Sequence, residues 1–400
     1  MAKTEISAEV CIVGGGPAGM VAGLLFARAG VKTLVLEKHK DFLRDFRGDT
    51  VHPSTLNLFD ELGLIDALLQ RPHDKVEDVE AVLGGRAYRI ADFTHLPGRG
   101  KFIAMMPQWE FLDFVAEQAR RYPAFSLRME TEGVEAIERG GRVTGVRTAT
   151  GGEIAAKLVI AADGRGSKLR AGLPLHDLGA PIDVLWFRVP KPRTAANETQ
   201  GYISGGEMIV AIDRGDYFQC ARVIEKGSAP AVLARGLDAF RAEVEKVVLP
   251  ARGLMHQLAS LDDVKLLTVT LDRLTQWSRP GLLAIGDAAH AMSPVGGVGI
   301  NLAVQDAVAA ANILAAPMAL GRDPDPLLAK VQARREFPVR VIQAIQRTVH
   351  RTVIRAALRG SVQKAPWIVR LIGRTPLLQR IPARVLGLGV RREHIRSPKA

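Results

Sequence analysis

A glycine-rich turn near the N-terminus constrains the fold of this 400-residue chain more than any other feature. The apolar run 10–13 leads directly into three glycines with G-x-G-x-x-G spacing: Gly14, Gly16 and Gly19. Helix-forming residues follow, and a second apolar run, 33–36, ends at Glu37. Strand, tight turn, helix, strand and acid in this order are the pattern of a nucleotide-binding βαβ unit. A chance glycine turn would lack the second strand and its acid.

The chemistry of this turn indicates which nucleotide it holds. Glycines let the backbone approach a pyrophosphate closely, and the unpaired N–H groups at the helix N-terminus stabilise its charge. Glu37 lies about 20 residues after the turn, where a carboxylate accepts hydrogen bonds from adenosine ribose hydroxyls. An acid at this place favours a ribose without a 2′-phosphate, as in FAD or NAD. We assign Ala18 and Lys38 to the same nucleotide contact.

A second glycine-rich segment lies far along the chain. The apolar run 282–285 ends in Gly286 and Asp287, and a glycine-rich loop then leads into a helical stretch, 301–316. Asp287 is placed to accept hydrogen bonds from hydroxyls, and a helix N-terminus stabilises an anionic ring edge. A flavin supplies both, in its ribityl chain and its reduced N1/C2=O edge. We expect the following residues to line it: Pro294, Gly297, Gly299, Ile300 and Asn301.

A third apolar run, 158–162, ends at Asp163 and is followed by Arg165. Together the GGGPAG, ADGRGSKLR and GDAAH…PVGGVGIN motifs resemble the group A flavoprotein monooxygenases, the para-hydroxybenzoate hydroxylase family, over roughly residues 10–316. The resemblance implies that NAD(P)H reduces the FAD and that dioxygen adds at the flavin C4a. The resulting hydroperoxide would hydroxylate an aromatic or polyketide-like small molecule. It also implies that Asp163 and Arg165 serve both FAD and a transiently bound NADPH or NADH.

The same resemblance points to further residues, each with a plainer alternative. Arg47 would contact the FAD ribose or pyrophosphate, or else be a surface arginine. His52 would lie beside the flavin and relay a proton, or else have a structural role at a helix start, and Pro294 would flank the ring. Gln108 would hydrogen-bond the cofactor, or else be solvated. The backbone of Val134 would hold the adenine, unless Val134 is an ordinary strand residue.

The expected fold class is α/β, with a Rossmann-like FAD-binding domain, an inserted β-sheet substrate domain and a C-terminal helical tail. The FAD-binding domain is expected to be discontinuous, over residues 1–75, 105–175 and 271–336. The substrate domain is expected over 76–104 and 176–270, and the helical tail over 337–400.

The helical tail holds the excess positive charge of the chain. It contains 14 Lys and Arg residues and one acid, a net charge of +13, whereas the whole chain carries +12. Four arginines spaced by four residues would line one helical face: Arg347, Arg351, Arg355 and Arg359. Because like charges four apart repel, an anionic neighbour is expected. Anionic lipid, an acidic partner and acids of the body are the candidates. We favour a tail that packs on the body with at most weak membrane contact.

Composition limits the remaining classes of function. Only two cysteines are present, Cys11 and Cys220, so no disulfide framework exists and a cytoplasmic location is expected. No signal-peptide core and no apolar run of membrane-spanning length is recognised. The nine histidines show no metal-ligand spacing, and no nucleic-acid-binding module is found. We expect no metal site and no nucleic-acid partner.

Two other functions remain open from the sequence. One is an FAD-dependent dehydrogenase or reductase that acts on a hydrophobic substrate without oxygen insertion. The other is a non-catalytic, flavin-stabilised component at a membrane surface. The sequence does not identify the substrate, the catalytic base or the oligomeric state.

Overall fold

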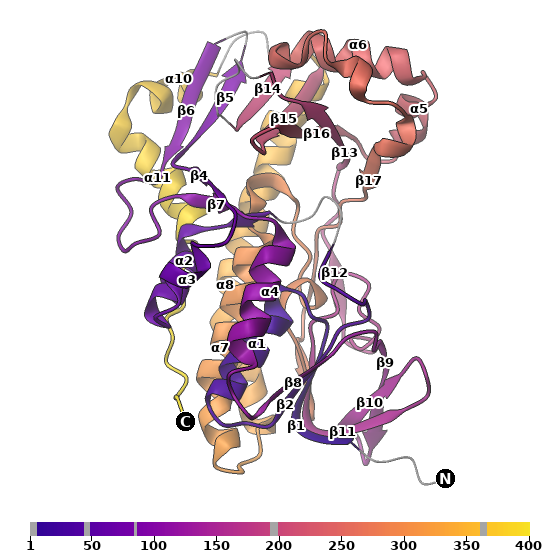
Figure 1. Cartoon of the computed structure of the whole chain (residues 1–400), viewed down its shortest axis with the longest axis vertical. Coiled ribbons are helices and arrows are strands. Elements are labelled where there is room, and N and C mark those ends of the chain that lie inside the picture. Colours follow the sequence, from indigo (N-terminus) through magenta and orange to yellow (C-terminus); the bar gives the residue numbers. More distant parts are fainter. Residues whose placement is uncertain (1–5, 44–48, 84–85, 193–198, 361–365) are drawn as a thin grey trace.

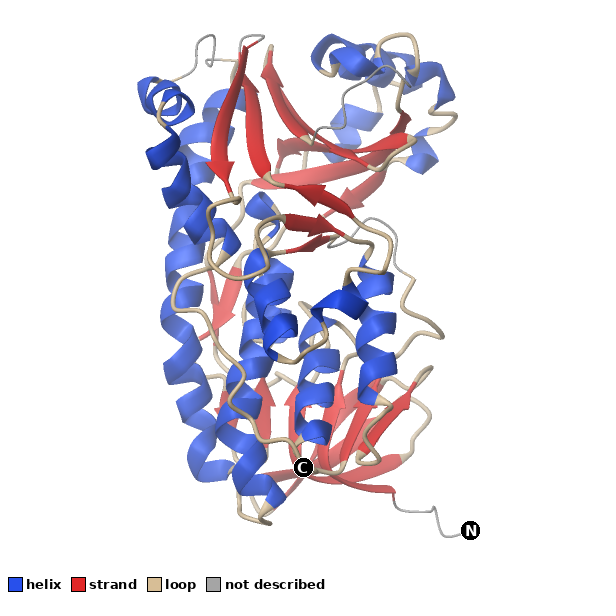
Figure 2. Ribbon diagram, turned by 60° about the vertical axis from the view of Figure 1, so that its left-hand side comes forward, coloured by secondary structure: helices blue, strands red, loops and turns tan. Residues whose placement is uncertain are grey.

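The computed structural model describes residues 6–43, 49–83, 86–192, 199–360 and 366–400. Two large sheets lie at opposite ends of an elongated molecule (Figure 1). Long helices run between them along the molecule (Figure 2). Arg47 lies outside the described residues, so its expected contact with FAD stays a prediction.

The first sheet has eight strands, six of them in the order β19-β20-β11-β1-β2-β8. In addition, β10 pairs with β11, and β9 pairs with β10. Its strands are β1 (Ile6–Val13), β2 (Thr33–Leu36), β8 (Phe125–Arg128), β9 (Gly133–Arg139), β10 (Arg142–Thr148), β11 (Glu153–Ala161), β19 (Ser278–Arg279) and β20 (Leu282–Ala284). The pairings β20–β11, β11–β1, β1–β2 and β2–β8 are all parallel. Because parallel strands end at one edge, the segments that follow β1, β2, β11 and β20 meet there.

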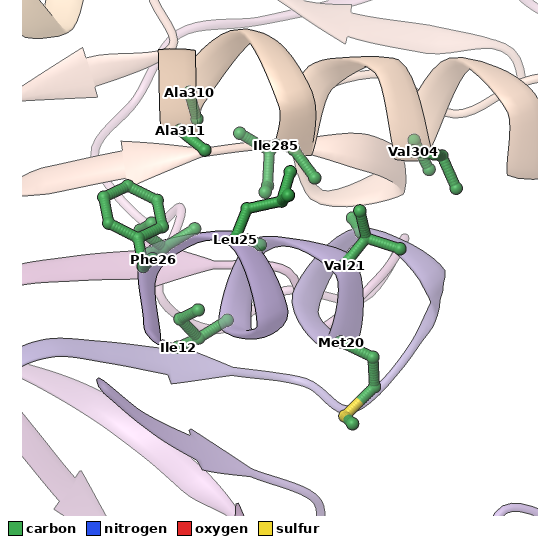
Figure 3. Packing of buried hydrophobic residues seen from close by; sticks show 14 of the residues in the cluster. Ile12, Met20, Val21, Leu25, Phe26, Ile285, Val304, Ala310 and Ala311 are labelled. Atoms are coloured by element: carbon green, nitrogen blue, oxygen red, sulfur yellow. The ribbon is translucent and has the colours of Figure 1, made fainter. Parts of the chain in front are cut away.

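Helices α1 (Pro17–Arg28), α4 (Gln108–Ala119), α7 (Gly299–Ala319) and α8 (Asp325–Val349) pack in this part of the molecule. Helix α1 is buried on nearly all sides, as a uniformly apolar helix must be. Figure 3 shows Val21 and Leu25 of α1 directed toward Val304 and Ile285. A Cβ at Gly23 would lie 2.7 Å from Val35, so α1 lies this close to β2 only with glycine there.

Helix α7 corrects one expectation from the sequence. By length and hydropathy, the helical segment Val295–Ala319 could cross a membrane, although no run of that length was expected. However, 78% of its apolar window is buried inside the protein, where α7 packs against α1 and α8. A core helix explains this composition.

The second large sheet has seven strands in the order β17-β13-β16-β15-β14-β5-β6. They are β5 (Asp78–Leu83), β6 (Arg86–Asp92), β13 (Ile182–Pro190), β14 (Gln200–Ser204), β15 (Glu207–Asp213), β16 (Tyr217–Glu225) and β17 (Lys265–Leu267). The expected segments 76–104 and 176–270 therefore contribute strands to one sheet. One face packs on α5 (Ala229–Leu233) and α6 (Leu237–Val247), where the Phe187 and Phe240 rings lie 5.1 Å apart.

Small elements connect the two large sheets. Strands β3 (Thr50–Val51), β7 (Ile103–Met105) and β4 (Asp74–Val76) form one small sheet, and β12 (Leu175–Asp177) pairs with β18 (Asp272–Leu274). Short helices α2 (Pro53–Glu61) and α3 (Ile65–Leu68) follow β3. The remaining turns are η1 (Leu249–Ala251), η2 (Met255–Gln257), η3 (Leu261–Asp263), η4 (Gly286–Ala288) and η5 (Val295–Gly297).

The C-terminal region is a series of packed helices. After α8 come the π-helical turn η6 (His350–Ile354), α9 (Arg355–Leu358), α10 (Trp367–Arg374) and α11 (Pro376–Gly387). Buried Ile354 packs with Val184 and Val223 on the second face of the seven-stranded sheet. The last residue returns to the end of α1, because the Ala400 N–H donates to the carbonyl of Arg28.

The evenly spaced arginines do not hold this region in place. Arg351, Arg355 and Arg359 are exposed, and neither they nor Arg347 form an ion pair with any acid in the described ranges. The region packs on the body through apolar residues, and the expected pairing of these arginines with acids of the body is not observed.

Candidate flavin site

The first glycine turn has the geometry that a bound pyrophosphate needs. Gly14 has a φ of 109°, and a Cβ there would lie 2.3 Å from the carbonyl oxygen of Ala162. A Cβ at Gly19 would lie 1.9 Å from the Gly14 carbonyl oxygen, so both positions require glycine. Gly16 is the N-cap of α1, and a Cβ there would meet nothing within 4 Å. The middle glycine therefore leaves the helix N-terminus open to a phosphate.

Glu37 stabilises this turn, and it is also the expected acceptor for the ribose hydroxyls. Its carboxylate accepts hydrogen bonds from the backbone N–H groups of Gly15 at 2.9 Å and His39 at 3.0 Å. Lys38 beside it is exposed. Ala18 is buried, and its side chain faces the position of a Cβ on Gly286, 3.0 Å away. Ala18 thus packs the turn against the second glycine segment.

The end of β11 lies against the same turn. Asp163 Oδ2 accepts a hydrogen bond from the Lys168 N–H at 3.1 Å, while its buried Oδ1 has no partner among the described residues. Burial raises the pKa of Asp163. The Thr131 N–H donates to the Glu37 carbonyl at 2.8 Å, which brings the segment before Val134 to the end of β2. These contacts place Asp163 and Val134 on two sides of the nucleotide turn.

An ion pair joins the two Asp-containing motifs. Arg165 Nε lies 3.0 Å from Asp287 Oδ2, and both side chains are partly exposed. Arg170 also reaches this segment and donates to the Ala288 carbonyl at 3.3 Å. Segments 122 residues apart in sequence therefore meet at one edge of the sheet, as the motif order predicts. The remaining lone pairs of Asp287 can accept hydrogen bonds from ribityl hydroxyls.

The loop before α7 presents backbone to this edge. Gly296 and Gly297 have φ of 82° and 62°, values that favour glycine. The Thr50 hydroxyl donates to the Gly297 carbonyl at 3.0 Å and ties the loop to β3. A Cβ at Gly299 would meet nothing within 4 Å, so the start of α7 is open. Pro294 lies just before these glycines and is partly buried. The N-terminus of α7 can therefore approach an anionic ring edge.

Asn301 has a different environment from the rest of this loop. Its side chain is buried, and its Oδ1 accepts hydrogen bonds from the hydroxyls of Ser54 and Thr55. The side-chain oxygen therefore ties α7 to α2, and the side-chain amide N–H groups and the backbone are left for a cofactor. Ile300 beside it is partly buried.

His52 lies against the glycine loop and is fully buried. Its Nδ1 lies 2.9 Å from the carbonyl oxygen of Leu386 on α11, and burial lowers the pKa of the ring. In the neutral ring Nδ1 donates this hydrogen bond, so Nε2 is an acceptor. A Cβ at Gly297 would lie 3.5 Å from Nε2. His52 can thus accept a proton next to the loop.

Gln108 is the first residue of α4, and its backbone hydrogen-bonds the carboxylate of Asp49. Asp49 also forms a largely buried ion pair with Arg214, which donates to the Met105 carbonyl at 3.4 Å. Burial raises the pKa of Asp49, although Arg214 opposes the shift. This pair links the residues before His52 to the substrate sheet. The pair was not predicted from the sequence, because neither residue belongs to a motif.

Helix α8 holds the segment before the glycine loop, and this too was missed. The Gln346 side chain accepts from the Ser293 N–H at 3.2 Å and donates to the carbonyls of Ser293 and Val295. One turn later, His350 Nε2 lies 2.9 Å from the Ser293 hydroxyl. Gln346 and His350 are four residues apart and so lie on one helical face, and this spacing is the one sequence signal for these contacts.

A buried ion network supports the Gly286–Asp287 turn. His290 Nε2 lies 2.6 Å from Asp306 Oδ2, which also accepts from the Gly286 N–H. Arg335 Nε donates to the other oxygen of Asp306 at 2.9 Å, and none of these side chains is more than 1% exposed. Burial opposes ionisation of Asp306, but His290 and Arg335 hold its pKa below the usual value. His290 thus orders the turn.

The seven-stranded sheet presents an apolar face to the glycine loop. Trp186, Met208 and Val210 belong to one cluster with Val295 of the loop. The indole Nε1 of Trp186 is buried without a partner in the described part of the chain. Arg222 of β16 faces the other way and pairs with Glu207 and Glu243. The Trp186 N–H on this apolar face is therefore a candidate donor to a ligand oxygen.

Three nucleotide-binding segments at one sheet edge, next to an apolar face of a second sheet, define a flavoprotein of the aromatic-hydroxylase type. Comparison with known proteins gives the family. Residues 7–345 match the FAD binding domain family, and the chain belongs to it.

The chain is 31% identical over 385 residues to 6-methylpretetramide 4-monooxygenase from Streptomyces rimosus, which covers 94% of this chain and 91% of the relative. It is 24% identical over 393 residues to dialkyldecalin synthase from Streptomyces rugosporus, over 92% and 80% of the two chains. The structure of p-nitrophenol 4-monooxygenase from Pseudomonas putida has the same fold, with a TM-score of 0.76 at 19% identity over 95% and 97% of the chains. The α/β fold class and the FAD-dependent monooxygenase family predicted from the motifs are confirmed.

Proposed function

We propose that this FAD-dependent monooxygenase hydroxylates a polycyclic aromatic polyketide, with NADPH or NADH as the reductant. One observation carries the substrate class: Trp186 and Met208 of the seven-stranded sheet and Val295 of the flavin loop pack against the same apolar cluster. The similarity to 6-methylpretetramide 4-monooxygenase along nearly the whole chain supports the same class.

The residues of this chain bind and orient the cofactor and the substrate, while the bound FAD supplies the oxygen chemistry. The N-terminus of α1 at Gly16 stabilises the pyrophosphate, and Asp287 accepts hydrogen bonds from the ribityl hydroxyls. The backbone from Pro294 to Gly297 positions the ring. The indole N–H of Trp186 donates to a substrate oxygen and so orients the ring to be hydroxylated.

His52 is our candidate for proton movement at the substrate hydroxyl. In its neutral ring Nε2 is an acceptor that has no hydrogen-bond partner among the described residues, and Nδ1 donates to the Leu386 carbonyl. A phenol whose proton passes to Nε2 becomes more electron-rich and reacts more readily with an electrophilic oxygen. The Leu386 side chain also lies beside the loop, because a Cβ at Gly296 would lie 3.1 Å from its Cδ2.

A cytoplasmic location is part of the proposal. Cys11 and Cys220 are both free and buried, and burial raises the pKa of the Cys11 thiol to about 12. Two inert thiols fit a reducing compartment. Nothing in the hydroxylation site requires a membrane.

A substrate panel tests the proposal. Purified protein with FAD is titrated with fused-ring phenols and with small carboxylated phenols, and the flavin spectrum and NADPH oxidation are followed. We expect spectral shifts and faster NADPH oxidation with fused rings. Stimulation by the small acids alone would contradict the proposed substrate class.

Trp186→Phe sharpens the test. It keeps the apolar face but removes the indole donor, so fused-ring binding should weaken by about fivefold to tenfold, the value of one hydrogen bond. Trp109→Phe is the matched control, because Trp109 lies on α4 and packs against the core of the FAD-binding domain. Equal effects of the two substitutions would remove Trp186 from the substrate site.

A further inference from the structure

Helices α10 and α11 leave large apolar side chains uncovered. Five of the twelve large hydrophobic side chains exposed in the described part of the chain are Trp367, Ile368, Leu371, Leu377 and Ile381. Trp367 is 69% exposed and Leu377 is 66% exposed, and α10 has no buried residue. Single exposed apolar residues are normal, but a concentration on two consecutive helices indicates a contact surface.

The two helices repeat one pattern of apolar and basic residues at a spacing of ten. The exposed positions are Trp367, Arg370, Leu371 and Arg374 in α10, and Leu377, Arg380, Ile381 and Arg384 in α11. In each helix they are residues i, i+3, i+4 and i+7, which fall within a stripe about 100° wide. We call these eight residues the docking stripe.

The opposite sides of both helices pack against the body of the protein, so the docking stripe faces solvent. A Cβ at Gly373 would lie 3.1 Å from the Tyr88 ring on β6. Ala383 of α11 is fully buried, and a Cβ at Gly387 would lie 2.7 Å from Leu96. Figure 1 shows α10 and α11 beside β6, at the edge of the seven-stranded sheet.

The charge of the stripe is uncompensated. The sequence contains no Asp or Glu between 361 and 392. None of the four arginines forms an ion pair with an acid in the described ranges. A second copy of the chain would bring the same positive stripe against itself, because a two-fold interface pairs identical surfaces. The stripe therefore fits a partner that is both anionic and able to accept apolar side chains.

We propose that α10 and α11 dock the protein on an anionic phospholipid membrane. Guanidinium groups bind lipid phosphates, tryptophan prefers the interfacial region, and amphipathic helices lie in the plane of such a surface. The stripe is close to the flavin site, because the same helix α11 contacts Gly296 and His52 through Leu386. This inference goes beyond the proposed hydroxylation, and its test needs no turnover.

The test is co-sedimentation of the full-length protein with vesicles of phosphatidylcholine, alone or mixed with phosphatidylglycerol, at low and high salt. We expect binding to the anionic vesicles only, weaker at high salt. R370Q/R374Q/R380Q/R384Q should lower the partition coefficient by about a hundredfold or more, since each basic residue at such a surface contributes about fivefold. W367S/L371S/L377S should lose binding even at low salt.

The matched control is R347Q/R351Q/R355Q/R359Q, which removes the same charge from α8, η6 and α9 and should keep most of the binding. On anionic vesicles the fluorescence of the wild-type protein should shift to the blue, and Trp367→Phe should lose most of that shift while still binding. Unchanged thermal midpoints show that the variants are folded.

Three results would overturn the proposal. The first is no binding of the wild-type protein to anionic vesicles. The second is an equal loss in both four-arginine variants, which would mean diffuse charge rather than a docking stripe. The third is a dimer in light scattering that W367S/L371S/L377S dissociates while vesicles stay unbound, which would make the stripe an interface between copies.

Discussion

Asp287 shows how one carboxylate serves both the fold and the cofactor. It pairs with Arg165 at 3.0 Å, yet it stays partly exposed where ribityl hydroxyls are expected. Its position at the end of β20 follows from the strand-Gly-Asp pattern, which can be read from the sequence. The partner Arg165 follows from the ADGRGSKLR motif, but their contact depends on the parallel pairing of β11 with β20, which most strands of the second sheet separate in sequence.

We expect Asp287→Ala to weaken FAD binding by about tenfold to a hundredfold. The loss of the acceptor leaves buried hydroxyls unpaired, at a cost of about 1–3 kcal/mol. The dissociation constant is measured by flavin fluorescence. Asp238→Ala is the control, because that side chain is 96% exposed on α6. Equal dissociation constants for the two variants would reject the assignment of Asp287.

His52 makes stability depend on pH. Burial holds the pKa of His52 below its usual value of 6.5, so the unfolded chain binds a proton that the folded chain does not. Its contribution to stability is complete above pH 6.5 and is lost as the pH falls, with a slope of up to about 1.4 kcal/mol per pH unit. The pKa of buried His350 is lowered in the same way.

His52→Gln should therefore reduce the loss of unfolding free energy between pH 7.5 and pH 5.5. Urea unfolding at both pH values measures this, and the exposed His256→Gln should keep the wild-type slope. A wild-type slope in His52→Gln would show that His52 is not the titrating group.

The site contacts that were not predicted from the sequence share one property. Asp49 and Arg214 are 165 residues apart, and Ser293 and His350 are 57 apart. None belongs to a motif, and each contact joins two elements whose relative position only the folded chain determines. The motif glycines were predicted because their role depends on the local turn. Asn301 was expected at the start of a helix, where it lies, but its hydrogen bonds to α2 could not be read from the sequence.

At the scale of elements, helix α8 connects the two parts of the molecule. A change in charge suggested a boundary at 337, but α8 continues from Asp325 to Val349 with Pro338 inside it. Charge does not end a helix, and the packing of its buried face compensates for the hydrogen bond that Pro338 cannot donate. The helix then carries Gln346 and His350 to the flavin loop.

The buried network of α8 and α7 should be worth several kcal/mol. We expect Arg335→Met to lower the free energy of unfolding by about 3–5 kcal/mol, because the Asp306 carboxylate loses a buried partner. The adjacent Arg334→Met is the matched control and should cost about 1 kcal/mol or less, since its pair with Glu393 is partly exposed. Equal costs in urea unfolding at pH 7 would contradict the network.

At the scale of the whole molecule, three short motifs predicted the FAD-binding domain because they lie at the ends of parallel strands. The substrate sheet has no such motif, and alternating apolar residues indicated only that a sheet was there. Its seven-stranded order, with β5 and β6 paired beside β14, depends on contacts between distant segments. The same holds for the C-terminal helices, whose packing on β6 the charge pattern did not indicate.

Incorporation of labelled oxygen tests the central claim most directly. The protein is incubated with FAD, NADPH, ¹⁸O₂ and the best fused-ring phenol of the panel, with catalase present to remove peroxide. We expect a product that contains one ¹⁸O atom from dioxygen in its new hydroxyl group. A product formed with oxidation of NADPH but without ¹⁸O would contradict hydroxylation and favour a dehydrogenase or reductase.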